Sequence, residues 1–232
     1  MRQRTLTVLA NNPDLISGIY NYCDRWCERC PLTSRCLVYA TEQEDDDSPE
    51  SRDIRNEAFW RKLGTILQET REMIVEWAKE AGVDLNGAAE DDEARDKRKR
   101  QLVDNHPLTK AGKKYANAAS DLLREFDQSV EVSDMEDARE VIQWYQYQIA
   151  VKTMRALSGR KEELEHDSDG SAKVALIGID RSIAAWRMMQ LSLPDRVESI
   201  VPLILQLDGL RRRLERSFPQ ARNFVRPGFD DD

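Results

Sequence analysis

The chain has 232 residues, 40% hydrophobic and 34% charged, with only 10 glycines and 8 prolines, a composition typical of a helix-rich globular protein. This excludes collagen and general disorder, and no apolar run approaches the roughly 18 residues of a membrane span. The net charge of −8 argues against nucleic acid as the main partner. The N-terminus lacks the apolar stretch of a signal peptide, so we expect a cytoplasmic protein.

All four cysteines lie within fourteen residues near the N-terminus, with the spacing C-x3-C-x2-C-x5-C. They are Cys23, Cys27, Cys30 and Cys36, and this clustering indicates that they act as one unit. The unit is a pair of disulfides, a structural zinc site or an iron–sulfur cluster. Disulfides fit least well, because they are typical of small secreted domains and this chain is large, without an export signal.

A helix is expected to carry the first three cysteines. Residues 12–14, Asn-Pro-Asp, have the pattern of a helix start, and Pro31 sets the helix end near Cys30. Cys23, Cys27 and Cys30 then share one face, with the outer two about 10 Å apart along the axis. Thiolates spaced in this way reach a single zinc ion poorly, whereas a cubane presents its irons on separate corners. This geometry favours an iron–sulfur cluster, and zinc stays the alternative.

Residues 27–40, CERCPLTSRCLVYA, resemble the cluster-binding segment of the WhiB-like iron–sulfur proteins, which has the pattern C-x2-C-P-x4-C-L-x-Y-A. The matching positions are Cys27, Cys30, Pro31, Cys36, Leu37, Tyr39 and Ala40. The resemblance implies that the three matching cysteines are ligands of a [4Fe-4S] cluster. It covers 14 of the 232 residues, and the fourth cysteine of that family lies further upstream than Cys23 does here. The family's basic DNA-binding tail is absent, so the resemblance implies a cluster and not a transcription factor.

The middle of the chain predicts a break and then a long helix. Residues 41–47, TEQEDDD, form the acidic break. The run 48–50, Ser-Pro-Glu, opens a helix that ends at Gly82. Residues 88–103 are dense in charge and predict an exposed helix or a mobile connection. The apolar stripe of the long helix consists of Phe59, Leu63, Ile66, Thr70, Ile74 and Trp77.

Further helices are expected over 109–128, from a capping box at Ser133 and Glu136 to Gly159, over 172–193, and from Pro194 onward. Residues 158–170 are expected to form a polar loop, and Pro202 to kink or divide the last helix. The last three helices have apolar stripes at Ala138, Ile142, Tyr145, Ile149 and Ala156, then Ala172, Leu176, Ile179, Ile183 and Trp186, then Ile200, Ile204, Leu207, Leu214 and Phe218. No segment alternates as strands do, so the predicted fold class is all-α, an antiparallel helical bundle.

The sequence contains no Walker loop, dinucleotide-binding glycine pattern or nucleophile elbow. Lys152 and Gln148 lie close to one apolar stripe and Arg181 lies close to another. We expect them to pair with Asp180 or Glu140 across the bundle. Such a network is either a structural ion pair or the pocket of an enzyme, and the structural pair is favoured because a catalytic motif is missing.

We therefore predict two domains, a cysteine-rich metal-binding helical module at 1–47 and a helical bundle at 48–232. The module is expected to hold a [4Fe-4S] cluster on the four cysteines, for redox sensing or for interaction with a protein partner. The alternative is a structural or adaptor protein, in which zinc at the same cysteines fastens the N-terminal helix to the bundle. The sequence does not define the oligomeric state. Without metal, residues 14–40 are expected to lose their structure while residues 50–218 stay helical.

Overall fold

The computed structural model describes residues 8–9, 11–44, 49–85, 90–127, 135–159 and 165–230. Every regular element in these ranges is an α-helix or a 3-10 turn, with no strand among them, which confirms the all-α class. None of the helices that these residues form is long and apolar enough to cross a membrane. The chain forms two compact units, Met1–Tyr20 with Cys27–Ala94, and Asn21–Trp26 with Arg95–Asp232.

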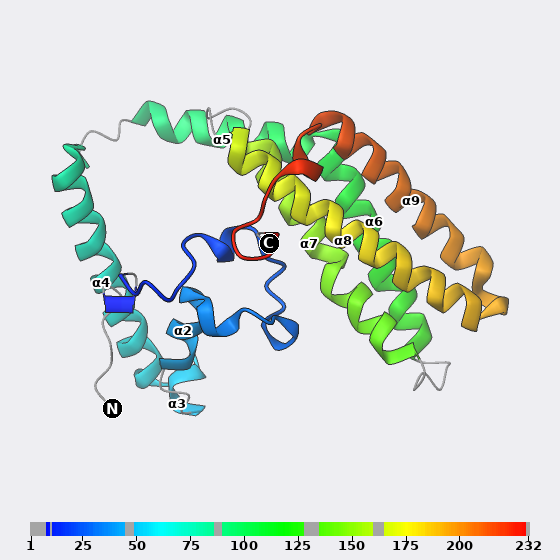
Figure 1. Ribbon diagram of the computed structural model, residues 1–232, viewed down its shortest axis with the longest axis horizontal. Coiled ribbons are helices and arrows are strands. Elements are labelled where there is room, and N and C mark those ends of the chain that lie inside the picture. The colour runs from blue at the N-terminus through cyan, green and yellow to red at the C-terminus, as the bar shows by residue number, and fades with distance from the viewer. Residues whose placement is uncertain are drawn as a thin grey trace. The chain divides into compact units, whose positions relative to one another are not determined.

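The second unit is built on a bundle of α6 (Pro107–Asp127), α7 (Glu136–Gly159), α8 (Glu165–Ser192) and α9 (Val197–Ser217). Each helix packs on the next, and α6 also packs on α9, which closes the bundle (Figure 1). Short connections make consecutive helices antiparallel. The predicted helical bundle is therefore confirmed in this unit.

The apolar stripes predicted for α7, α8 and α9 form the core of the bundle. Tyr145, Leu176, Trp186 and Leu207 are all completely buried. The indole N–H of Trp186 donates to the hydroxyl of Tyr115, at an N–O distance of 3.0 Å. Burial raises the pKa of Tyr115 to about 12, so this hydroxyl stays protonated at neutral pH. The period of 3.6 residues in the sequence thus identified the buried faces correctly.

The long helix expected from residue 48 to Gly82 is two helices, α3 (Pro49–Arg52) and α4 (Glu57–Ala81), while Ser48 lies outside the described residues. Asp53 accepts a hydrogen bond from the backbone N–H of Arg55, and Asn56 caps α4 by accepting from Ala58, both at 3.0 Å. These short polar side chains satisfy backbone groups in a turn and interrupt the helix. Gly82 ends α4 in the left-handed conformation with φ of 68°, as predicted.

Three other boundaries differ from the sequence prediction. Residues 41–44 of the expected acidic break belong to α2 (Leu37–Glu44), because Glu and Gln are good helix formers. The expected polar loop is helical from Glu165, where α8 begins. Helix α9 continues through Pro202, which lies in its second turn.

Two further predictions, for the charge-dense segment 88–103 and for the helix from Ser133 to Gly159, fall partly outside the described residues. The charge-dense segment forms α5 (Glu90–Asn105), whose described side chains are mostly exposed. This confirms the exposed helix as the correct alternative of the two predicted. The proposed cap at Ser133 lies outside the described residues, while α7 ends at Gly159 as expected.

The segment that carries the cysteines is not the predicted helix. It consists of the 3-10 turns Ile19–Asn21, Cys27–Arg29 and Thr33–Arg35, joined by irregular chain. Arg25 and Gly18 have positive φ angles of 59° and 73°, which a right-handed helix does not accommodate. The first three cysteines therefore do not share a helix face. The geometric preference for an iron–sulfur cluster over zinc loses its basis with that helix.

Candidate functional site

None of the four cysteines forms a disulfide, and each side chain is partly buried. Cys23 belongs to the second unit, whereas Cys27, Cys30 and Cys36 belong to the first. The backbone N–H of Leu32 donates to Sγ of Cys30, at an N–S distance of 3.4 Å. Among the described residues, no three His, Cys, Asp or Glu side chains are grouped so that they would hold a metal ion. The four thiols supply the donor chemistry of a thiolate site.

The first unit folds its cysteine segment by backbone contacts. The N–H of Ile16 donates to the carbonyl of Arg35 at 2.9 Å, so the chain just before Cys36 lies beside Ile16. Helix α2 follows at once, because the carbonyl of Cys36 accepts from the N–H of Ala40 at 2.9 Å. Cys36 therefore stands at the start of a helix, and Cys30 directly follows the 3-10 turn Cys27–Arg29.

The segment Asn21–Trp26, called the docked segment below, packs on α7 and α8 of the bundle. Its centre is the Asp24 carboxylate, which pairs with the Arg181 guanidinium at 2.7 Å and accepts from the Tyr145 hydroxyl. The carbonyl of Asp24 accepts from the indole N–H of Trp144 at 2.8 Å and from the Gln148 amide. Burial, followed by the hydrogen bond to Asp24, raises the pKa of Tyr145, which keeps its hydroxyl protonated as the donor.

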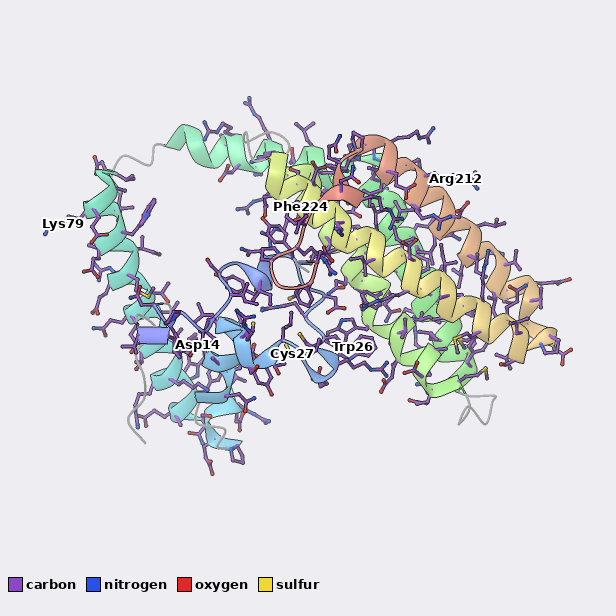
Figure 2. All side chains as sticks on the ribbon, in the orientation of Figure 1. Asp14, Trp26, Cys27, Lys79, Arg212 and Phe224 are labelled. Carbon is purple, nitrogen blue, oxygen red and sulfur yellow. The ribbon has the colours of Figure 1, made fainter. Side chains whose placement is uncertain are left out.

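Aromatic packing completes the attachment at the end of the docked segment. The ring of Trp26 stacks on Trp144, with centroids 5.1 Å apart and planes 15° apart, and meets the edge of Tyr145 at 6.0 Å. Figure 2 shows Trp26 beside α7. Pairs of this kind contribute about 0.5–1.5 kcal/mol beyond the area that they bury. Trp26 thus adds an apolar anchor to the polar contacts of Asp24.

At the beginning of the docked segment, Tyr22 packs against the C-terminal region of the chain. Its ring contacts Phe224 at a centroid distance of 4.7 Å, and both rings lie over Gly170 of α8. A Cβ at Gly170 would lie 2.4 Å from a ring carbon of Tyr22 and 2.7 Å from Phe224. Only glycine allows this close approach, so Gly170 makes room for the docked segment.

Cys23 lies between these anchors, close to a buried lysine. The ammonium of Lys152 donates to the carbonyl of Asn21 at 3.1 Å, and only 8% of the lysine is exposed. Burial lowers the pKa of Lys152. Burial also raises the pKa of the Cys23 thiol, while the positive charge of Lys152 acts to lower it. The docked segment thus fixes Cys23 next to a positive charge.

The sequence correctly singled out Gln148, Lys152 and Arg181, but it predicted the wrong partners. Arg181 pairs with Asp24, while Asp180 pairs with Arg211 at 3.3 Å and with Arg222 at 2.6 Å. These three residues, for which a structural role was favoured over an enzyme pocket, hold a segment of the chain itself. Sequence reasoning missed Asp24, although its position next to Cys23 was a usable signal.

The chain was also compared with known proteins. Comparisons with protein-family models, with curated proteins and with solved structures gave no match.

Replacing Asp24 with Ala is expected to lower the free energy of unfolding of the second unit by about 1–2 kcal/mol. The change leaves the Arg181 guanidinium and the Tyr145 hydroxyl without the carboxylate, and the exposure of Arg181 limits the loss. Urea unfolding followed by tryptophan fluorescence measures this change in the free energy of unfolding. The control is Asp195→Ala on the exposed surface, expected to stay within about 0.5 kcal/mol. Equal stability of the two variants would contradict the proposed role of Asp24.

Proposed function

We propose that the protein binds a metal centre through Cys23, Cys27, Cys30 and Cys36, and that this centre is a [4Fe-4S] cluster. The observation that carries the proposal is that all four cysteines of the chain lie within fourteen residues and that none of them forms a disulfide. Structural cysteines that act singly have no reason to cluster in this way. Four thiolates are the ligand set of both zinc and iron–sulfur centres.

One observation supports the cluster over zinc, namely the resemblance of residues 27–40 to a known cluster-binding segment. The backbone N–H of Leu32 also donates to the sulfur of Cys30. Hydrogen bonds to cysteine sulfur are one means by which proteins set the potential of an iron–sulfur centre. When bound, such a centre supplies one-electron redox chemistry or sensitivity to oxidants. We assign it to redox sensing or to a protein–protein interaction.

One of the four proposed ligands, Cys23, belongs to the docked segment, which is attached to the bundle. Asp24 and Trp26 fasten the segment to α7 and α8 by their own contacts. A zinc ion is therefore not required to fasten the segment, which weakens the adaptor alternative. Because Cys23 belongs to the docked segment, gain or loss of a metal centre acts on residues attached to the bundle.

Metal analysis of protein prepared without oxygen tests the proposal. We expect brown protein with broad absorbance near about 400 nm, and about four iron atoms and four sulfides per chain. Colourless protein with one zinc per chain would show that the site binds zinc and not an iron–sulfur cluster. Protein that retains neither metal after reconstitution with iron and sulfide, or with zinc, would overturn the metal centre itself.

A further inference from the structure

The face of α7 and α8 beneath the docked segment directs five side-chain donors at it. Gln148 and Lys152 follow Trp144 at four and eight residues, so these donors lie along one side of α7. Tyr145 is completely buried and Lys152 is 8% exposed, so both would be costly to leave without an acceptor. The five donors are Trp144, Tyr145, Gln148 and Lys152 of α7 and Arg181 of α8.

The docked segment supplies acceptors that other peptides also have. Two of them are the backbone carbonyls of Asn21 and Asp24, which are independent of side-chain identity. The third is Oδ2 of Asp24, which faces Arg181, while Oδ1 accepts from the backbone N–H of Trp26 at 3.2 Å. This internal hydrogen bond fixes the tryptophan relative to the carboxylate, and its ring then stacks on Trp144. The contacts therefore select a peptide with aspartate two positions before tryptophan.

The docked segment is a short excursion of the chain from the first unit. That unit includes the chain up to Tyr20 and again from Cys27, and the six residues between them belong to the second unit. The chain enters the second unit once more at Arg95 and stays in it to the end. The bundle is therefore connected to the first unit through Arg95 whether or not the docked segment is in place. A second peptide with the same features can take the position of the docked segment without any break in the chain.

We propose that this face of α7 and α8 is a binding site for an extended peptide segment of a partner protein, with aspartate two positions before tryptophan. The docked segment occupies the site within the chain itself. Arg181 and Tyr145 recognise the carboxylate, and Trp144 recognises the indole. A segment of the same chain competes at a high effective concentration, so the partner binds when the docked segment is displaced. None of the five donors is a cysteine, so the proposal does not depend on the metal centre.

Binding of a synthetic peptide to the full chain tests the proposal. The peptide has the sequence of residues 19–28 with Cys23→Ser and Cys27→Ser, and a fluorescent label whose anisotropy reports binding. The receptor is the full-length double variant Asp24→Ala with Trp26→Ala, whose own segment lacks the carboxylate and the indole. We expect saturable binding at least about tenfold tighter than to the wild-type chain, where the docked segment competes. Adding Arg181→Met to the double variant is expected to weaken binding at least about tenfold, because the peptide carboxylate loses its charged partner.

Variant peptides test whether recognition follows the same contacts. A peptide with Asp24→Asn is expected to bind at least about tenfold more weakly. The matched control, Arg25→Asn, is expected to change binding by less than about twofold, because Arg25 is exposed and asparagine tolerates its left-handed conformation. Circular dichroism checks that each receptor is folded. If the double variant does not fold, the single variant Trp26→Ala takes its place, with an intermediate affinity expected. A folded receptor that does not bind the peptide, equal binding to receptor and wild type, or equal affinities of the two variant peptides would overturn the proposal.

Discussion

Replacing Cys27 and Cys30 together with serine is expected to abolish metal binding while the four-helix bundle stays folded. Two of four thiolate ligands are removed, and serine hydroxyls do not replace them for either zinc or an iron–sulfur centre. The bundle has its own core, in which Trp186 and Tyr145 are completely buried. We therefore expect complete loss of bound metal with an unchanged thermal transition of the bundle.

The same variant tests how much structure the metal centre imposes. Residues 27–40 are expected to lose protection from proteolysis and hydrogen exchange, because so small a segment rarely holds its structure without metal. The docked segment is expected to keep its protection, since Asp24 and Trp26 fasten it to the bundle directly. The loss of structure is therefore expected over residues 27–40, a shorter range than the 14–40 predicted from the sequence. Ser34→Ala in the same segment is the control and should bind metal normally. Loss of the bundle's transition in the double variant would show that the centre belongs to the main core.

Replacing Trp186 with Ala is expected to destabilise the second unit by about 3–5 kcal/mol, as is usual when a fully buried aromatic side chain is truncated. Trp186 is completely buried in α8, and its N–H donates to the hydroxyl of Tyr115. The variant therefore creates a cavity and also removes the partner of a buried polar group. A loss of this size is a large part of the stability of a typical domain.

Urea unfolding followed by circular dichroism measures this loss. The control is Leu191→Ala in the same helix, where 85% of the side chain is exposed, and it is expected to stay within about 0.5 kcal/mol. Trp186→Phe is expected to fall between the two, because it keeps part of the ring volume and loses the hydrogen bond. Near-equal stability of Trp186→Ala and Leu191→Ala would show that the bundle is not the stable core of the chain.

The sequence by itself determined the features that depend on neighbouring residues along one helix. The stripe at Ile142, Tyr145 and Ile149 is buried as its spacing predicted, because a helix buries one face wherever it packs. Gly82 ends α4, because only glycine adopts the left-handed conformation there without strain. The clustering of the four cysteines, which carries the metal proposal, is likewise a property of the sequence alone.

Tertiary structure alone decided the conformation of the docked segment. The periodicity of residues 14–30 predicts a helix, but Asp24 pairs with Arg181 across 157 positions, and Trp26 stacks on Trp144. Such distant partners leave no trace in local spacing, and the contacts outweigh the weak helical preference of a short segment. Arg25 accordingly adopts a left-handed conformation, because its neighbours are held by the bundle and the turn between them must close.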